Sequence, residues 1–515
     1  MKRATAFLEI LLLSALVLAT RCANYPDVFV GGNIIFADGD CYARMTRVRL
    51  CAQHPGLIIR HHTFENFPDG VTPHTTAPLD YLILGLAFLC KPFASSPTDL
   101  AGALISPLLG WLAGIFLWWW SRRMKFRFRW ALLILYAISP ILVHGTELGR
   151  PDHQSLLIVL MGIALCAEWI VQAEKSNSWS VVSGFAWAIA LWISLYEPLL
   201  LFSIVLLIAL LRDPPSIAAP YRRIGWICFG GTLLLALTIE QRLPSLPSIH
   251  ATSAFHNWSR NIGELQKVSL PNPIWFQWIG WLIFALPLLV WLGLRNKTRV
   301  PVFISVLLLA TFFLTIWQAR WGYFFALIVA IALPGFLELM KSKRIVWIVF
   351  AISVLPILRA WDEKLWPNES ESARRIEQRH EALEFRALAV TLIGSGQRAF
   401  IAPWWLSPAI AYWSGQAGVA GSSHESLPGI IDTARFFVSQ DAATARDLLI
   451  KREVGWVFSY DAGRVEENCA SLLGQATPDR PLIRLLDQRP AQAPALFMLS
   501  AQNGTGKVYQ IGNNR

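Results

Sequence analysis

The chain has 515 residues, of which 54% are hydrophobic and only 15% are charged. Soluble proteins of this size carry about 25% charged residues, so the composition excludes an ordinary soluble enzyme. The formal net charge of +11 does not indicate nucleic-acid binding, because Lys and Arg gather in short loops between apolar runs, as in membrane proteins. Seven Cys do not make a disulfide scaffold in so long a chain, and whether Cys41 pairs with Cys51 stays open.

Apolar runs of about 17–20 residues recur as far as residue 359 and predict a polytopic α-helical membrane protein. The run at 79–92 is too short to span and is expected to form an interfacial helix on the outer side. The first run is expected to stay in the protein, because Arg21 stands where signal-peptide cleavage favours a small residue. We expect about eleven spans, at residues 4–20, 98–120, 130–146, 155–172, 178–195, 197–211, 224–240, 274–294, 301–317, 321–339 and 345–360.

The basic loops predict the orientation of the chain. Lys2 and Arg3 favour a cytoplasmic N-terminus in a cell inner (plasma) membrane. Because the number of spans is odd, the chain after residue 360 is expected outside, as an extracytoplasmic domain. Charges rise and apolar runs shorten there, which predicts a soluble mixed α/β domain at 361–515, following a membrane domain at 1–360 with outer loops 21–97 and 241–273. Four further basic loops fall on the cytoplasmic side in this topology, at 121–127, 212–223, 295–299 and 341–344.

Carboxylates recur in three separate outer loops. Asp38 and Asp40 follow the first span, Asp152 begins the fourth, and Glu264 lies in the loop 241–273, with Glu240 as a competing candidate. Acidic residues are depleted beside membrane segments unless a cationic partner offsets their cost. Mg²⁺ and Mn²⁺ prefer carboxylate oxygens. The pattern therefore predicts a divalent-cation site gathered from several loops.

A series of short motifs follows the same outer loops. Asp38 is followed six residues later by Arg44, Asp152 and His153 lie within Gly149–Gln154, and Glu264 lies within Gly263–Gln266. In this order, the series resembles the oligosaccharyltransferase catalytic subunits, which are membrane glycosyltransferases of the GT-C class. Gln154 stands where that family has the second acid of its second motif.

Two further positions extend the resemblance over most of the chain. Arg320 falls where the family has an Arg that contacts the donor pyrophosphate, and Pro403–Pro408 stands where it carries a Trp-Trp-Asp-Tyr-Gly signature. In the family, the Trp-Trp-Asp triplet binds the hydroxyl of the acceptor's Ser or Thr. Here Leu406, Ser407 and Pro408 replace the Asp and the Tyr-Gly pair. The resemblance therefore implies retained catalysis and altered acceptor recognition.

The resemblance implies a metal-dependent, inverting transfer of a glycan at the outer membrane face. The donor would be a polyprenyl-(pyro)phosphate glycan, the acceptor a protein, and the cofactor Mn²⁺ or Mg²⁺. The implied roles are catalysis by Asp38 and Glu264, metal binding by Asp38, Asp152 and Glu264 with His153 and Asp40 as additional candidates, donor binding by Arg320 and Arg44, and acceptor binding by Trp404, Trp405 and Ser407.

Other functions stay open at this stage. A GT-C transferase with a polyprenyl-monophosphate sugar and a lipid, glycan or Ser/Thr acceptor shares the outer acids, and the missing signature Asp favours it. A transporter of lipid-linked sugars would need charged or broken helices near the middle of the membrane. A membrane-anchored binding protein would not need so many helices. Tyr196-Glu197-Pro198 is interpreted as a structural turn, and the adjacent His61 and His62 are not expected to bind a metal.

Overall fold

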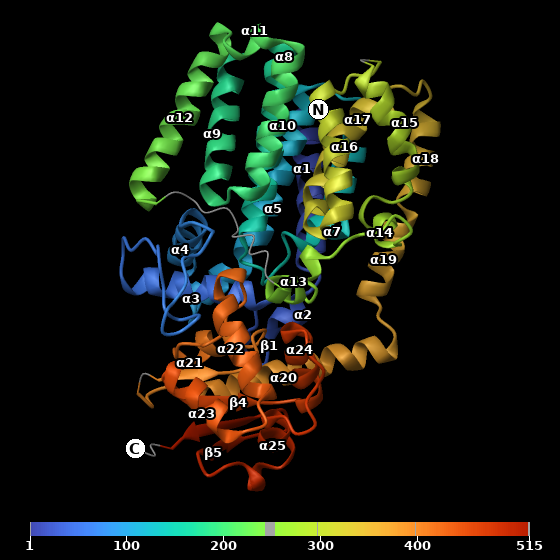
Figure 1. Cartoon of the computed structure of the whole chain (residues 1–515). Coiled ribbons are helices and arrows are strands. Elements are labelled where there is room, and N and C mark those ends of the chain that lie inside the picture. Colours follow the sequence, from blue (N-terminus) through green and yellow to red (C-terminus); the bar gives the residue numbers. More distant parts are fainter. Residues whose placement is uncertain (1, 243–252, 296, 397, 513–515) are drawn as a thin grey trace.

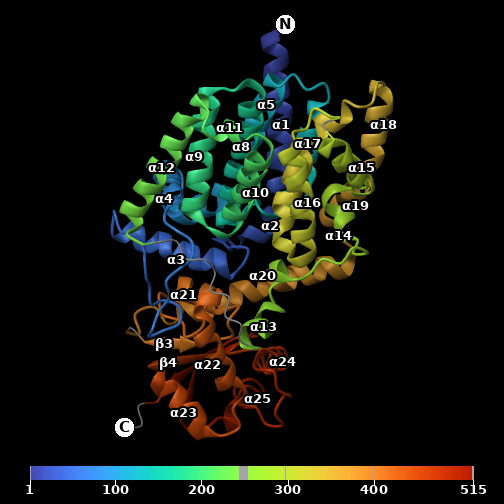
Figure 2. The same ribbon diagram turned by 45° about the horizontal axis from the view of Figure 1, so that its top comes forward.

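The computed structural model describes residues 2–242, 253–295, 297–396 and 398–512. An upright helix bundle occupies one half of the molecule, and a domain built around a four-stranded sheet lies at one end of it (Figure 1). The start of the first helix lies at the opposite end of the bundle (Figure 2). This arrangement agrees with the predicted membrane domain followed by a soluble α/β domain.

Each predicted span coincides with one helix or with a broken pair of helices. Within the described residues, five helices are long and apolar enough to cross a membrane alone, or six if α18 and α19, bent by 42°, form one span. The polytopic helical fold is confirmed, whereas the number of spans stays a prediction. The bundle contains α1 (Lys2–Arg21), α5 (Pro97–Arg123), α6 (Arg129–Ile138), α7 (Pro140–His144), α8 (His153–Glu174), α9 (Asn177–Ile193), α10 (Tyr196–Arg212), α11 (Pro214–Ile217), α12 (Pro220–Glu240), α14 (Ile274–Ile279), α15 (Leu282–Leu294), α16 (Val302–Trp317), α17 (Gly322–Leu337), α18 (Lys343–Ser353) and α19 (Leu355–Leu365).

The break between α14 and α15 has an identifiable cause. Gly280 has a φ of +68°, and a Cβ there would lie 2.0 Å from the Ser353 carbonyl oxygen, so only glycine fits. The next amide, Trp281 N, donates to the same carbonyl at 2.8 Å. Because Ser353 is the last residue of α18, this contact connects the break between α14 and α15 to the break between α18 and α19.

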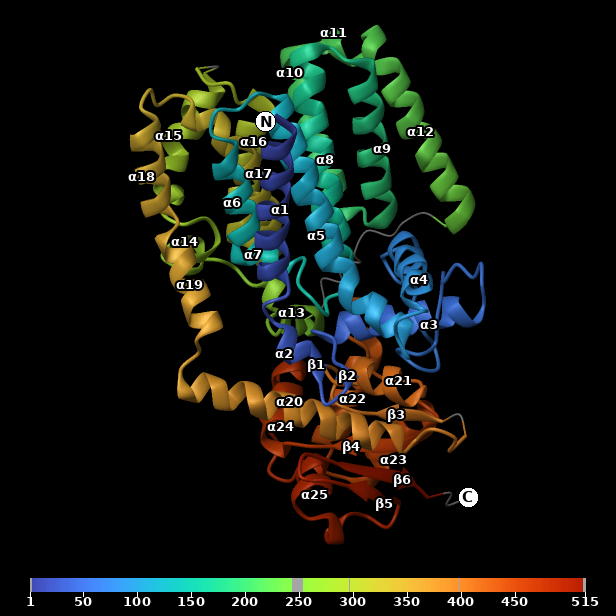
Figure 3. The ribbon, with the colours of Figure 1, turned by 180° about the vertical axis from the view of Figure 1, so that it is seen from behind.

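Short elements fill the region between the bundle and the soluble domain (Figure 1, Figure 3). A helix does form at the predicted interfacial segment, as α4 (Pro78–Cys90), beside α3 (Gly39–Gln53). Asp38 starts α3 as its N-cap, because its carboxylate accepts a hydrogen bond from Cys41 N at 3.0 Å. The other short elements here are α2 (Tyr25–Val28), β1 (Phe29–Val30), β2 (Asn33–Ile34), α13 (Ser253–Ser259), η1 (Gly263–Leu265) and η2 (Ala319–Trp321).

The soluble domain is a mixed α/β fold, as predicted. Its sheet has the order β3-β4-β6-β5, in which β3 and β4 are parallel and the other pairs are antiparallel. The long helix α20 leads from the bundle across the domain (Figure 3). The elements are α20 (Glu369–Val390), β3 (Ala399–Ile401), α21 (Ser407–Ser414), η3 (His424–Ser426), α22 (Leu427–Val438), α23 (Ala442–Lys451), β4 (Val454–Ser459), α24 (Ala462–Leu473), α25 (Leu482–Gln488), η4 (Pro490–Gln492), β5 (Phe497–Gln502) and β6 (Lys507–Ile511).

The first outer loop binds directly to the soluble domain. Gly418 donates from its N–H to the Phe64 carbonyl at 2.9 Å and accepts from Phe67 N at 3.2 Å. Buried Arg452 adds hydrogen bonds to the Phe67 carbonyl and to Asn66 Oδ1, at 3.1 and 3.3 Å, and an ion pair with Asp69 at 3.1 Å. The loop that follows Asp38 and the soluble domain therefore share one interface.

Candidate active site at the outer end of the bundle

Asp38 is held from the fourth span. Arg150 donates a hydrogen bond to Asp38 Oδ2 at 2.6 Å, while the Asp38 side chain stays 40% exposed. Arg150 also contacts Glu147 Oε1 at 3.4 Å and His144 Nε2 at 3.1 Å. The tight turn that positions it depends on Gly149, whose φ is +75° and whose Cβ would lie 2.7 Å from a neighbouring side chain. Asp38 therefore presents one edge of its carboxylate to solvent and the other to the guanidinium of Arg150.

Asp40 lies beside Asp38 and contacts the soluble domain. Its Oδ1 accepts a hydrogen bond from the Ser422 hydroxyl at 2.5 Å. Although the side chain keeps an exposed edge, desolvation by the surrounding protein and the negative charges of Asp38 and Asp152 raise the pKa of Asp40 to about 7. The neighbouring acids are therefore close enough to disfavour the ionisation of Asp40.

Asp152 caps α8 and orients His153. Its Oδ1 accepts from His153 N at 2.7 Å and lies 2.6 Å from His153 Nδ1. Burial raises the pKa of Asp152, but the charge and hydrogen bond of His153 more than offset this and hold it well below its usual range. Nε2 of His153 and both amide atoms of the neighbouring Gln154 are buried without a hydrogen-bond partner. Buried polar atoms are rarely left without a hydrogen-bond partner, so these atoms are expected to bind a ligand.

Glu264 lies on η1, which is fixed against η2 by the hydrogen bond from Ala319 N to the Gln266 carbonyl, at 2.9 Å. Its Oε1 accepts from the Tyr323 hydroxyl at 3.1 Å. Burial, together with the charge of Asp152, raises the pKa of Glu264 against the opposing charge of Arg320. Glu264 is thus a half-buried acid within reach of the negative charge of Asp152.

A continuous hydrogen-bond chain joins the two predicted catalytic acids. Arg150 bridges Asp38 and His144, whose Nδ1 lies 2.8 Å from the Tyr323 hydroxyl, and Tyr323 in turn donates to Glu264. Because a guanidinium can only donate, His144 Nε2 must accept, which leaves the proton on Nδ1 for the Tyr323 oxygen. Arg150 therefore donates in both directions: directly to Asp38, and to His144, from which the bonds continue through Tyr323 to Glu264.

Arg320 projects from η2 towards buried Glu197. Its Nη2 lies 2.6 Å from Glu197 Oε1, and its guanidinium lies 5.5 Å from the centre of the Tyr196 ring. The guanidinium is 16% exposed, so one edge stays open to the site. The turn at Tyr196 that we interpreted as structural therefore also orients the predicted donor-binding residue.

Two predicted contacts are corrected by the geometry. Arg44 is buried and pairs with Asp80 Oδ1 at 2.8 Å and with the Thr75 hydroxyl at 3.0 Å, so its guanidinium is already used inside the outer loop and is not open to a donor. Ser407 is fully buried and donates its hydroxyl to the carbonyls of Ala402 and Pro403, so it offers no group to an acceptor.

The other predicted positions lie as follows. Trp404 and Trp405 are half-buried and perpendicular, with ring centres 5.7 Å apart. Trp404 donates to Asn468 Oδ1 at 2.9 Å, and its ring lies 6.3 Å from that of Trp258 in α13. The competing acid Glu240 accepts from Ala77 N and Trp192 Nε1, each at 3.0 Å, which gives it a structural role.

Among the described residues, Asp38, Asp152 and Glu264 do not form a group whose ligand atoms all lie within 4.8 Å of one another. Within the residues that the structure describes, the metal-type group whose ligand atoms all lie within 4.8 Å of one another is instead His74, His424 and Glu425. The three predicted acids still have the ligand type that a hard cation prefers, because they supply carboxylate oxygens. The amide of Gln154, near Asp152, is buried without a hydrogen-bond partner.

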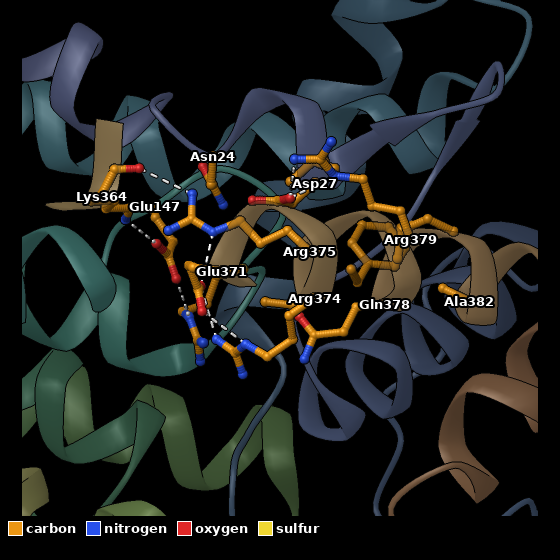
Figure 4. A pocket seen from close by; sticks show the side chains of 15 residues that line it. Asn24, Asp27, Glu147, Lys364, Glu371, Arg374, Arg375, Gln378, Arg379 and Ala382 are labelled. Atoms are coloured by element: carbon orange, nitrogen blue, oxygen red, sulfur yellow. Dashed lines mark hydrogen bonds and ion pairs between the residues drawn. The ribbon is translucent and has the colours of Figure 1, made fainter. Parts of the chain in front are cut away.

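A cleft of about 380 Å³ lies between α20 and the segment that follows α1 (Figure 4). Arg150 lines this cleft and reaches from it to Asp38. The ion pairs around the cleft join different elements. Arg379 of α20 pairs with Asp27 of α2, and Lys364 of α19 pairs with Glu147 in the turn that leads to Arg150, whereas Arg374 and Arg375 pair with Glu371 inside α20 itself.

The sequence did not identify several residues of this site. Arg150 lies in the same motif as Asp152, and this neighbouring position could have identified it as a site residue. His144 and Tyr323 lie inside apolar runs, where one polar side chain carries no signature. Ser422 comes from the soluble domain, 382 residues from its partner Asp40.

Neither a protein-family model nor a curated protein sequence matches this chain. Among solved structures, it resembles the oligosaccharyltransferase of Archaeoglobus fulgidus tethered with an acceptor peptide containing the NVT sequon, with a TM-score of 0.64 at 13% identity over 88% of this chain and 68% of that one. The archaeal oligosaccharyltransferase AglB from the same organism, in complex with an inhibitory peptide and a dolichol-phosphate, gives 0.64 at 12% identity, over 99% of this chain and 75% of that one. The enzyme of the first match, in complex with zinc and sulfate, gives 0.64 at 13%, over 98% and 74%. The chain therefore has the fold of the oligosaccharyltransferase catalytic subunits, as the motifs implied.

Proposed function

We propose that this protein is a membrane glycosyltransferase that moves a glycan from a polyprenyl-(pyro)phosphate donor to a protein acceptor at the outer membrane face. The observation that carries the proposal is the hydrogen-bond chain from Asp38 to Glu264, which couples acids from two separate outer loops within an oligosaccharyltransferase fold. The start of α1 and the soluble domain lie at opposite ends of the bundle, which supports a multi-pass protein that has them on opposite sides of a membrane. The basic loops support a cytoplasmic N-terminus in an inner (plasma) membrane.

Asp38, Asp152 and Glu264 would hold a divalent cation, Mn²⁺ or Mg²⁺. When bound, such a cation supplies Lewis-acid stabilisation of the charge that develops on the departing phosphate. His153 and Asp40 are additional candidate ligands on the same side. The raised pKa of Asp40 supports this assignment, because several acids held close together favour any cation that offsets their repulsion.

Donor binding is assigned to Arg320. Its guanidinium keeps an open edge, and its planar fork matches phosphate oxygens better than the ammonium of a Lys. Glu197 holds the opposite edge, so the side chain is oriented before the donor arrives. The acceptor nucleophile then attacks the anomeric carbon from the face opposite the phosphate. The phosphate oxygen leaves with the bonding pair, and the configuration at the sugar inverts.

Asp38 and Glu264 are placed to accept hydrogen bonds from the acceptor's N–H or O–H. The raised pKa of Glu264 strengthens it as a proton acceptor at the moment when the nucleophile loses its proton. The aromatic pair Trp404 and Trp405 supplies a wall on the side of the soluble domain, next to Trp258. Acceptor binding by this wall is therefore apolar in character.

A second candidate function is favoured by Leu406. It stands where the family has the acidic residue of its signature, and its neighbour Ser407 is buried, so the wall offers no carboxylate to the hydroxyl of an Asn-x-Ser/Thr acceptor. The alternative is transfer from a polyprenyl-monophosphate sugar to a lipid, a glycan or a Ser/Thr side chain, through the same acids.

The decisive experiment incubates purified protein in Mn²⁺ with radiolabelled polyprenyl-pyrophosphate glycan or polyprenyl-monophosphate sugar. Peptide and lipid acceptors are supplied in parallel. Label that moves to a peptide supports the main proposal, and label that moves to a lipid supports the alternative. Asp38→Asn and Glu264→Gln are expected to lower transfer at least 100-fold, whereas the exposed control Asp447→Asn is expected to match wild type. Full activity in either acid variant would contradict both candidates.

A further inference from the structure

We propose that His74, His424 and Glu425 form a zinc-type metal site that joins the first outer loop to the soluble domain, separate from the cation assigned to the acids. The three residues come from two parts of the chain that are 350 residues apart, and their ligand atoms all lie within 4.8 Å of one another. His74 belongs to the loop before α4, and His424 and Glu425 form the first part of η3.

The distances suit a shared ion. His424 Nδ1 lies 3.3 Å from Glu425 Oε2, and His74 Nδ1 lies 2.6 Å from Glu425 Oε1. Two ligands on a tetrahedral zinc with bonds of about 2.0–2.1 Å lie roughly 3.3 Å apart, so His424 and Glu425 already have ligand spacing. The contact between His74 and the other oxygen of Glu425 is shorter than this and has to open. The rings of His74 and His424 lie 5.3 Å apart at their centres.

The donor set selects a different metal from that of the acids. Two imidazoles and one carboxylate are a common zinc combination, whereas Mg²⁺ and Mn²⁺ favour all-oxygen sites such as Asp38, Asp152 and Glu264. The three side chains are only 12–23% exposed, so solvent competes weakly for their ligand atoms. The two clusters therefore need not exchange metals.

A second observation points to a ligand at the same place. The His153 ring lies 5.7 Å from that of His74, centre to centre, and His153 is more than nine-tenths buried. Its Nδ1 faces Asp152 at 2.6 Å, whereas its Nε2 has no hydrogen-bond partner. A carboxylate on one imidazole nitrogen is the usual support for a metal on the other. His153 is thus a candidate ligand for this ion as well as for the cation at the acids, and it stands outside the group whose ligand atoms all lie within 4.8 Å of one another.

The site has a structural consequence for the acids. Ser422 lies two residues before His424 and donates to Asp40 at 2.5 Å, and its N–H donates to Glu65 at 3.1 Å. A metal that fixes His424 against His74 also fixes Ser422 against Asp40. The ion would position the soluble domain, on the side that carries α21 and α22 and faces the bundle (Figure 1).

The test measures metal content and does not depend on transfer activity, so it stands apart from the proposed function. Full-length protein carrying Asp38→Asn, which weakens the acid site, is stripped with chelator, reloaded with zinc chloride, desalted and analysed for zinc. One equivalent is expected in this background and none after adding His424→Ala. His61→Ala, an exposed histidine of the same loop, is the matched control and should retain the full equivalent.

Thermal unfolding provides the second measurement, because a ligand that binds the folded state raises Tm. Zinc should raise the Tm of wild type, of Asp38→Asn and of His61→Ala, and should leave that of His424→Ala unchanged. If His424→Ala does not fold, Glu425→Gln replaces it, since the amide keeps the hydrogen bond to His74 but removes the anionic ligand. At least a tenfold weaker zinc affinity is then expected. Unchanged zinc content and Tm response in these variants would overturn the proposal.

Discussion

Tyr323 donates its phenolic hydrogen to Glu264, with 3.1 Å between the two oxygens. Tyr323 begins a buried helix, whereas Glu264 lies in an outer loop, so this bond fixes a loop acid to a rigid element. The same phenol faces His144 Nδ1 at 2.8 Å, which connects it to Arg150 and Asp38. The position of one acid is therefore coupled to that of the other.

Tyr323→Phe removes this coupling without changing the size of the ring. We expect kcat for transfer to fall roughly 10- to 100-fold, because a hydrogen bond to a charged group contributes about 1.5–3 kcal/mol. The donor KM should change little, since Arg320 is untouched. Tyr25→Phe, at an exposed ring, is the matched control and should leave both constants at wild-type values. Initial rates across donor concentrations separate the two outcomes, and an unchanged kcat would rule out a role for the chain.

Arg320→Lys tests donor binding. The ammonium keeps the charge but loses the planar fork, so we expect the donor KM to rise roughly tenfold while kcat changes less. Arg359→Lys is the control, because its side chain is 82% exposed on α19. Equal KM values for Arg320→Lys and wild type would remove Arg320 from the donor site.

Asp80→Asn tests the structural placement of Arg44. Asp80 is 1% exposed and pairs with Arg44 and Arg47, at 2.8 and 2.6 Å. Removing its charge leaves two buried cations uncompensated, and we expect a loss of about 3–5 kcal/mol of stability. Asp27→Asn, at the half-exposed pair with Arg379, should cost about 0–1 kcal/mol. Chemical denaturation in detergent measures both, and a similar small effect for the two variants would contradict the buried pairing.

Glu65 gives a prediction for pH. Burial, together with the charges of Asp40 and Glu425, raises its pKa to about 8, even though Ser422 N donates to it. The folded state therefore binds this proton more tightly than the unfolded state, whose Glu pKa is about 4.3. It follows that stability from this group is lost as pH rises from about 4.5 to about 8.

Glu65→Gln removes the titration but keeps an oxygen for the Ser422 N–H. We expect the fall in Tm between about pH 5.5 and about pH 8.5 to shrink by at least about 1 °C. His62, at 3.8 Å, does not interfere, because burial lowers its pKa to about 3. Asp40 continues to titrate in the variant, so part of the slope remains. Glu363→Gln, at an exposed pair, should retain the whole wild-type slope; an equal slope for Glu65→Gln would disprove the shift.

Apolar runs predict the helices well, because lipid and core impose the same composition over a whole segment. They do not predict the interruptions. The break at Gly280 depends on contact with Ser353, 73 residues later in the chain. That contact is a property of packing, and the sequence around Gly280 carries no sign of it.

Charged residues show the same limit. Arg44 matches a family spacing, yet six residues turn a helix by about 600°, so Arg44 lies on a different face of α3 from Asp38. Three residues later, Arg47 returns to the face of Arg44, and both bind Asp80 in α4. The acids were identified from the sequence because acidic residues are rare beside a membrane. Their partners Arg150 and Ser422 belong to residue types that are common in loops, so their residue type does not single them out.

The contacts of Arg452 change where the molecule should be divided. This guanidinium is 2% exposed, and three of its partners, at Asn66, Phe67 and Asp69, belong to the first outer loop. A fragment that begins after residue 360 would keep only its pairing with Asp432 and would expose the edge at Gly418. Composition places a domain boundary near residue 360, but the contacts of Arg452 and Gly418 join residues 64–69 to the soluble domain across that boundary. We therefore expect stable expression of the C-terminal part to need residues 64–69 attached to it.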